Sequence, residues 1–294
     1  MMGETSDESR NDEDDVLARK LEAVVWTFAK WPEQYKRMKR WRARLDDPVD
    51  DVERRRDDFY AFFTAAYHNG FGHQFAIGLE SANLVQAAFK DAPDIESAKR
   101  KLTDLLGEQA TEIERHAERV DFETGWRYLG IDLSPAPLKD VSIGAAIEEL
   151  IQQPFGSAGT LTASGAITAA LKAVDVRQTG YNGLMLPILE DSRLAERWAE
   201  GRVSLEGLLS YSSVCATGLD TIPLPGDVSI EQLDMILADV ATLAVKWKKP
   251  LSARLLPVKG KGPGEPTAFD NPFLVNTVIQ PFSRAGASRG NTTE

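Results

Sequence analysis

SYSSVCATGLDTIPLPGD, residues 210–227, is the most informative segment of this 294-residue chain. The apolar run at 208–216 predicts a strand that delivers Cys215 to a tight turn. Asp220 follows the turn, and a Pro-Leu-Pro-Gly element then leads to Asp227. Proline fixes the backbone angle φ, and glycine permits close backbone approach. The pattern therefore predicts a rigid loop, and binding and catalytic residues are often carried by such loops.

Cys215 is the single cysteine of the chain, so no disulfide can form within it. A thiol in a shielded loop could act as a nucleophile or as a radical relay. The alternative is a small thiol packed in the core, since cysteine is among the most buried residue types. The residue type leaves both interpretations open.

Short apolar runs alternate with helical patterns on either side of this segment. Strands are predicted at 74–80, 126–134, 183–189, 252–258 and 273–281. Helices are predicted from Ser81, from Asp94, over 142–151, over 159–174, and after a capping box formed by Ser229 and Gln232. This alternation predicts an α/β fold whose neighbouring strands are largely parallel.

Composition divides the chain into four regions. Residues 1–15 are dense in acidic side chains and predict a disordered acidic tail. Residues 16–66 predict a helical N-terminal region, 67–282 the α/β domain, and 283–294 a frayed C-terminal tail. The helical region is a plausible surface for homo-oligomer formation.

The charge balance argues against two classes of partner. The chain has 34 basic and 45 acidic residues, a net charge of −11. This disfavours nucleic acid and anionic membranes as partners. The chain also has no apolar run of about 20 residues and no signal peptide pattern. A cytoplasmic protein with a small-molecule ligand is therefore expected.

Several carboxylates stand at predicted strand ends or in the loop, where they could converge. A converging set could bind a divalent cation, or supply an acid and a base with different pKa values. Alternatively, these side chains stabilise turns and cap helices. They are Asp132, Glu190, Asp191, Asp220 and Asp227. Ligand spacing does not demand a metal, and no cofactor is indicated.

Basic residues complete the candidate site. Arg254 lies on an otherwise apolar predicted strand, so it is either an ion-pair partner for Asp220 or an anchor for a substrate anion. Lys249 and Lys261 could offset further negative charge. The loop around Lys261, PVKGKGPGE, lacks the Walker pattern and could equally be a mobile lid.

His68 and His73 flank a glycine-bearing turn and could bind a metal or move a proton. A separation of five residues is awkward on a helix. This spacing favours histidines in an exposed loop instead.

Four segments closely resemble signatures of uncharacterised protein family 0210, also called the domain-of-unknown-function 711 family. They are GIDLSPAP (130–137), GLMLPILED (183–191), VCATGLDTIPLPGDVS (214–229) and KPLSARLLPVKGKGPGE (249–265). The resemblance spans about residues 60–282. It implies a fold like that of the glycyl radical enzymes, such as pyruvate formate-lyase: an α/β barrel of about ten strands, surrounded by helices, with a loop inserted into it.

In that fold the inserted loop carries the reactive cysteine, and Cys215 is its counterpart here. The resemblance also matches Asp132, Glu190, Asp191, Asp220, Asp227, Lys249, Arg254 and Lys261 to family positions. Radical chemistry is disfavoured, because the C-terminal glycine Gly286 is not followed by an aromatic residue and a second cysteine is absent.

Two functional hypotheses follow. The first is an enzyme acting on a small polar or anionic metabolite, with Cys215, Asp220, Asp227 and Glu190 as catalytic residues. Its substrate-binding residues would be Arg254, Lys249, Lys261 and Asp132. The second is a non-catalytic ligand-binding or regulatory protein that uses the same barrel.

Overall fold

A computed structural model describes residues 24–28, 73–215, 217–248 and 251–281. For residues 24–28 it describes the backbone alone. Its helices are α4 (Ala82–Phe89), α5 (Ile95–Thr124), α6 (Ile143–Ile151), α7 (Thr160–Lys172), α8 (Ser192–Ala199), α9 (Leu205–Tyr211) and α10 (Ile230–Trp247). Its strands are β1 (Val24–Phe28), β2 (Gln74–Gly78), β3 (Arg127–Asp132), β4 (Gly218–Pro225) and β5 (Leu251–Val258). The α/β class predicted from the sequence is confirmed.

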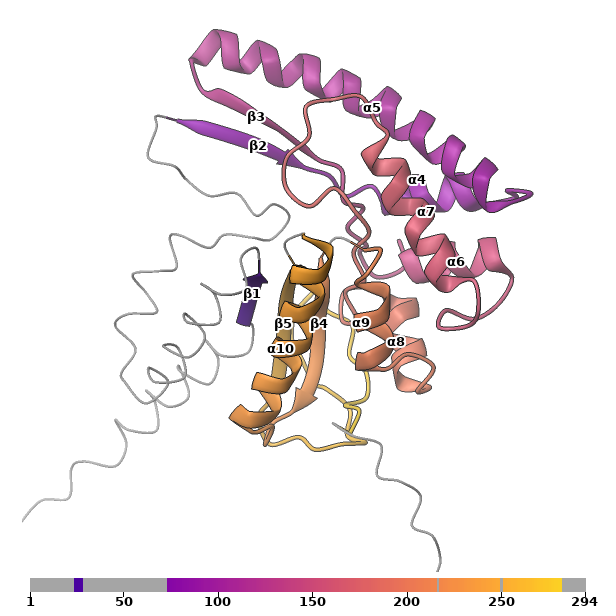
Figure 1. Ribbon diagram of the computed structural model, residues 1–294, viewed down its shortest axis with the longest axis vertical. Coiled ribbons are helices and arrows are strands. Elements are labelled where there is room, and N and C mark those ends of the chain that lie inside the picture. The colour runs from indigo at the N-terminus through magenta and orange to yellow at the C-terminus, as the bar shows by residue number, and fades with distance from the viewer. Residues whose placement is uncertain (1–23, 29–72, 216, 249–250, 282–294) are drawn as a thin grey trace, which may run out of the picture.

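The strands form two small sheets (Figure 1). In one, β5 lies between β4, which is parallel to it, and β1, which is antiparallel. In the other, β2 and β3 are parallel. These described strands form no closed barrel, so the ten-stranded barrel stays a prediction.

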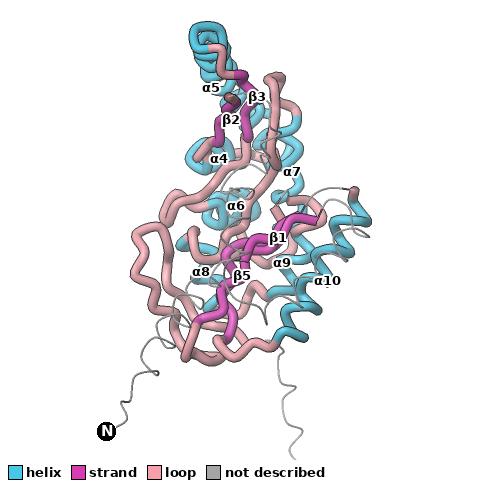
Figure 2. The backbone as a smooth tube through the Cα atoms, turned by 90° about the vertical axis from the view of Figure 1, so that its left-hand side faces the viewer, coloured by secondary structure: helices cyan, strands magenta, loops and turns pink. Residues whose placement is uncertain are grey.

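The sheet of β4 and β5 has an apolar face and a polar face, because successive side chains of a strand point to opposite sides. On β5, Leu251, Ala253 and Leu255 share one face, and this face joins the hydrophobic core together with α10. Ser252 and Arg254 lie on the opposite face. Figure 1 shows α10 running along β5 and β4, and Figure 2 shows β1 and β5 with α10 to one side.

Helix α5 packs against β3, and helices α4 and α7 pack against α5. Asp94 starts α5 as predicted, since its side chain accepts a hydrogen bond from Ser97 N, and the capping box at Ser229 and Gln232 starts α10. Among the described residues, no helix is both long and apolar enough to cross a bilayer. His73 is exposed and stacks on Trp126, while its predicted partner His68 lies outside the described residues.

The prediction of a strand at 208–216 is wrong, because most of this run belongs to helix α9 and to the turn after it. Ser204 caps the helix by accepting from Gly207 N, and Leu208 and Ser212 are both buried at a spacing of four. A short apolar run does not distinguish a strand from a buried helix, and here the helical period is the one that packs.

The predicted rigid loop is instead strand β4, whose eight residues are all buried. Pro223 and Pro225 are two positions apart, so their missing N–H groups face the same edge of the strand. On the edge away from β5, the described pairing with the segment around Pro187 involves only Asp220 and Thr221. The prolines therefore lie beyond that pairing, where no donor is needed.

Three other segments differ from their predicted structure. Residues 183–189 and 273–281 form no continuous strand and pair only through isolated bridges, Pro187 with Asp220 and Pro266 with Val278. The first segment still contributes a neighbour to β4, because Ile188 N donates to Asp220 O at 3.1 Å. Within the region predicted to be helical, the described residues Val24–Phe28 form strand β1, as expected for a β-branched and aromatic run. The other predictions for residues 1–66, and the prediction for the C-terminal tail, concern residues outside the described ranges.

One buried carboxylate, Asp191, caps two helices at once. Its Oδ1 accepts from Arg193 N and Leu194 N, both at 3.0 Å, at the start of α8, and from Ser142 Oγ. Its Oδ2 accepts from Ile143 N at 2.7 Å and Gly144 N at 3.2 Å, at the start of α6. The predicted capping role of this acidic residue is confirmed, and it extends to a second helix 48 residues earlier in the chain.

Replacing Asp191 by alanine leaves five donors at two buried helix starts without their acceptor. We expect the free energy of unfolding to fall by about 3–4 kcal/mol in urea denaturation. Asp94→Ala is the control, because Asp94 is an exposed cap of one helix, and its loss should be much smaller. Equal losses in the two variants would contradict the double cap.

Candidate functional site

An irregularity in β4 lies directly opposite Arg254. Leu219 pairs with Ala253 and Ile222 with Leu255, so Asp220 and Thr221 together face the single residue Arg254 of β5. This is a β-bulge, a feature that re-aims side chains and occurs often beside active sites. Thr221 has φ +46°, which is unusual for a β-branched residue and costs about 1–3 kcal/mol.

The bulge brings two carboxylates to one guanidinium. Arg254 Nε donates to Asp220 Oδ1. Its two terminal nitrogens hold Glu190, with Nη1 to Oε1 at 2.9 Å and Nη2 to Oε2 at 3.0 Å. Three segments thus contribute one residue each: β5, β4 and the turn that precedes α8. The ion pair between Arg254 and Asp220, one of the two alternatives from the sequence, is present.

The cluster is buried on the polar face of the sheet. The exposed fractions of the side chains are 4% for Asp220, 10% for Arg254 and 14% for Glu190, so Glu190 is nearest to solvent. Asp220 Oδ2 is buried and accepts no hydrogen bond from any of the described residues. A buried acceptor left without a donor costs about 1–3 kcal/mol. This oxygen therefore has hydrogen-bonding capacity that the described residues do not use.

The cluster carries more negative than positive charge. Burial raises the pKa of Glu190, the charge of Asp220 raises it further, and Arg254 lowers it only in part. Burial by itself would lower the pKa of Arg254, but the two carboxylates outweigh this effect and raise it. Glu190 thus holds a proton to higher pH than an exposed glutamate, and Arg254 stays charged.

Asp132 is also buried, but its position is that of a turn-stabilising residue. Its carboxylate accepts from Ser134 N, Ser134 Oγ, Tyr181 N and Asn182 N at 2.6–3.1 Å. Burial raises its pKa, and these bonds lower it in part. At Gly180, an added Cβ would lie 2.2 Å from Asp132 Oδ2, so the close approach of the two segments requires glycine.

Cys215 lies in the hydrophobic core, between α9 and β4, with 1% of its surface exposed. Its N–H donates to Tyr211 O at 2.8 Å, which continues the last turn of α9. This placement is the one that the packed-thiol interpretation expects, and the catalytic role of Cys215 stays a prediction.

Asp227 and Lys261 lie at the far end of β4 and β5. Asp227 is exposed beyond Pro225, and that strand end is on the order of 16 Å from Asp220. Beside it, Gly226 N donates to Lys261 O at 2.9 Å. The Nζ atom of Lys261 lies 3.8 Å from Glu265 Oε1. The structure therefore does not bring these two residues to the Arg254 cluster. Lys249 lies outside the described residues.

One residue of the site, Thr221, was not assigned a role from the sequence. Thr221 gives no signal in the sequence, because a threonine inside an apolar run is typical of any strand. Its Oγ1 accepts from Leu189 N at 3.1 Å and so fixes the segment that carries Glu190.

Among the described residues, no group of three or more histidine, cysteine or acidic side chains is arranged to hold a metal ion.

Comparison with known proteins agrees with the resemblance seen in the sequence. The sequence model of the family described as "Uncharacterised ACR (DUF711)" matches residues 56–273. A UPF0210 protein of Pyrobaculum arsenaticum is 34% identical over 69% of this chain and 48% of its own length. One of Pyrobaculum aerophilum is 36% identical over the same shares, and one of Desulforudis audaxviator is 30% identical over 78% and 52%. The chain spans about half the length of the curated relatives it matches.

Replacing Arg254 by methionine leaves Asp220 and Glu190 buried without a cation. We expect a loss of about 3–5 kcal/mol in the free energy of unfolding at pH 7. The deficit should shrink as the pH falls, because the pKa of Glu190, already raised by burial, rises further without its cation, and the folded chain then binds this proton more tightly than the unfolded chain. Urea denaturation between pH 4 and 8 measures both effects.

The control for this variant is Lys99→Met, which removes a cation from a surface pair with Glu96. Its loss should stay below about 1 kcal/mol. A deficit in Arg254→Met that does not depend on pH would contradict the charge imbalance described for the cluster.

Burial of Cys215 predicts that iodoacetamide does not label the native protein. Labelling should begin only as the chain unfolds in urea, and mass spectrometry of the alkylated chain measures it. Rapid labelling of the folded protein, with an apparent pKa well below about 8.5, would instead indicate an accessible thiolate.

Proposed function

This chain belongs to the DUF711 family, and we propose that it is an enzyme whose Arg254, Asp220 and Glu190 form an acid–base site for a small polar metabolite. The observation that carries the proposal is Asp220 Oδ2, a buried carboxylate oxygen on a strained bulge for which the described part of the chain supplies no donor. Strain and unsatisfied polar groups are costs that proteins retain where ligands bind.

The two carboxylates have different environments, which suits them to different roles. Asp220 Oδ2 accepts a proton from an N–H, O–H or C–H group of the substrate. Glu190, whose pKa is raised, returns a proton to another substrate atom. Arg254 donates to both carboxylates and fixes their distance, so its role is positioning. The reaction class is proton transfer, as in an isomerisation or an elimination.

The charge of the site limits the class of substrate that it can bind. Arg254 already donates through Nε, Nη1 and Nη2 to carboxylates, which makes it a poor anchor for an anion. The vacant acceptor on Asp220 favours a substrate that offers a hydrogen-bond donor. A neutral polar metabolite therefore fits this site better than an anionic one.

The fold proposed for the whole protein is the barrel of the glycyl radical enzymes. Its support is the set of parallel neighbours that extends beyond the named strands: Pro187 beside Asp220, Lys139 beside Asp191, and Gln178 beside Ile131. In this proposal the polar face of β4 and β5 lines the barrel interior. A cytoplasmic location and assembly into a homo-oligomer belong to the same proposal.

A non-catalytic binding protein is the second candidate. The observation that favours it is that each charged group of the cluster is bonded to another, as in a structural network. The core position of Cys215 also favours a binding protein, because a thiol buried in the core does not contact a substrate.

Incubation with a mixture of small polar metabolites, followed by mass spectrometry, tests the proposal. The wild type should deplete one compound and form a product. Glu190→Gln and Asp220→Asn should slow this conversion by about 100-fold or more. The rate of the wild type should fall as the pH rises through the raised pKa of Glu190, because the protonated form is the acid.

Glu108→Gln, an exposed carboxylate on α5, is the matched control and should convert at the wild-type rate. Conversion that survives in Glu190→Gln and Asp220→Asn would contradict the acid–base site. A compound that is retained by the protein but not converted would favour the binding protein instead.

A further inference from the structure

A cavity of about 760 Å³ lies away from the Arg254 cluster, between the α8–α9 loop, the end of β4 and residues 278–281. This volume is within the range of small-molecule sites in proteins. Its apolar lining includes Trp198, Leu205, Tyr211, Pro223, Leu224 and Ile279. Strand β4 contributes Pro223 and Leu224, near its C-terminal end, to the lining of this cavity. The acid–base residues do not line it.

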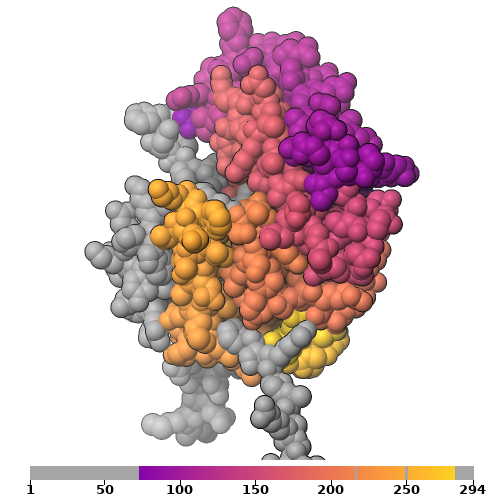
Figure 3. Space-filling model, turned by 45° about the vertical axis from the view of Figure 1, so that its right-hand side comes forward, coloured from indigo at the N-terminus to yellow at the C-terminus, as the bar shows by residue number. Residues whose placement is uncertain are grey.

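Side-chain hydrogen bonds fix the walls of the cavity. Trp198 Nε1 donates to Val278 O at 3.0 Å. Gln280 Nε2 donates to Trp198 O at 2.6 Å and to Val203 O at 2.8 Å. Figure 3 shows the yellow C-terminal segment lying against the salmon and orange residues that contain α8 and α9. The cavity is therefore formed before any ligand binds, which lowers the entropic cost of binding.

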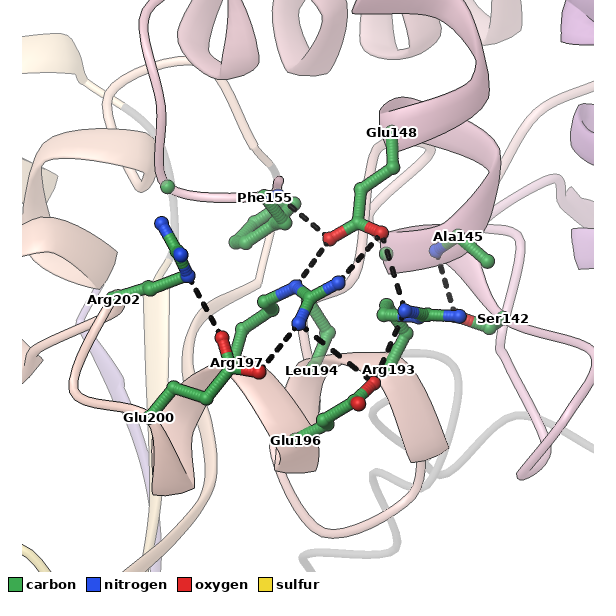
Figure 4. A network of polar contacts seen from close by, with 12 residues as sticks. Ser142, Ala145, Glu148, Phe155, Arg193, Leu194, Glu196, Arg197, Glu200 and Arg202 are labelled. Atoms are coloured by element: carbon green, nitrogen blue, oxygen red, sulfur yellow. Dashed lines mark hydrogen bonds and ion pairs between the residues drawn. The ribbon is translucent and has the colours of Figure 1, made fainter. Parts of the chain in front are cut away.

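A glycine and a partly buried ion pair hold the opposite wall. At Gly156, where φ is +97°, an added Cβ would lie 2.5 Å from Arg202 O, so only glycine permits this contact. Next to it, Glu148 Oε1 accepts from Phe155 N at 2.8 Å and from Arg197 Nε at 2.6 Å (Figure 4). The loop that carries Gly156 is thus tied to α6 and α8.

The charged residues of the lining leave one carboxylate uncompensated. Glu200 is paired with Arg197 and with Arg202, both at 2.7 Å (Figure 4). Glu206 is exposed, and its carboxylate makes no ion pair or hydrogen bond with any residue that the structure describes. The mouth of the cavity therefore attracts positive charge. The half-buried ring of Tyr211 adds to this preference, because ring faces attract cations.

We propose that this cavity binds a small organic cation with an apolar body, such as an aryl or alkyl amine. The apolar body lies against Leu205, Tyr211 and Val278, which line the cavity and are partly exposed, and the ammonium group lies at Glu206. The site is separate from the Arg254 cluster, so the two can be tested independently.

Benzylamine, benzyl alcohol and benzoate are probes of nearly the same size and shape with charges of +1, 0 and −1. Titration calorimetry on the full chain should show benzylamine binding at least about tenfold more tightly than benzoate. Glu206→Gln should weaken benzylamine binding by about fivefold and leave benzyl alcohol unchanged. Glu112→Gln removes an exposed carboxylate of α5 and should change neither.

A second variant tests the location. Gly207 lines the cavity within α9, and an added Cβ there meets only Ser204 Oγ at 3.7 Å. Gly207→Leu should fill the cavity and abolish binding of benzylamine and benzyl alcohol while the melting temperature is kept. Binding that persists in Gly207→Leu, equal affinities for the three probes, or no binding of benzylamine would each overturn the proposal. Acid–base activity at Arg254, Asp220 and Glu190 should be unchanged in both cavity variants.

Discussion

The arrangement of this molecule depends on burying the Asp191 carboxylate at the meeting point of α6 and α8. A carboxylate removed from water is costly, and burial raises its pKa. Five donors from the starts of the two helices offset this cost. Since each helix leaves its first N–H groups without partners, one carboxylate satisfies two helix ends. The two helices are thereby fixed relative to one another.

The same interaction positions the candidate site, because Glu190 is the residue before Asp191. With Asp191 directed into the helix starts, the turn at 188–190 is held beside β4, and Glu190 reaches Arg254. Thr221 contributes from the other side through its bond to Leu189 N. The strained bulge in β4 and the cap of two helices thus act on one short segment, and this segment carries a carboxylate with a raised pKa.

The two proposed sites share β4 but use different parts of it. Asp220 lies at the bulge, where the strand faces the segment around Pro187, while Pro223 and Leu224 lie at the cavity beyond that pairing. The prolines make this division possible, since they lack the N–H groups that a further neighbouring strand would need. The edge of β4 is therefore left for a cavity instead of for another strand.

The sequence by itself determined the α/β class, the capped starts of α5 and α10, and the expectation that Arg254 needs a negative partner, either a carboxylate of the chain or a substrate anion. Each of these follows from local chemistry: helix ends need acceptors, and an arginine on an apolar strand needs a counter-charge. Only the tertiary structure decided that most of 208–216 is helix and turn, that Asp220 and Thr221 form a bulge, and that Asp191 serves α6 as well as α8. Those outcomes depend on partners 30 or more residues away, and on which of two allowed conformations packs better. A local pattern in the sequence carries no record of either.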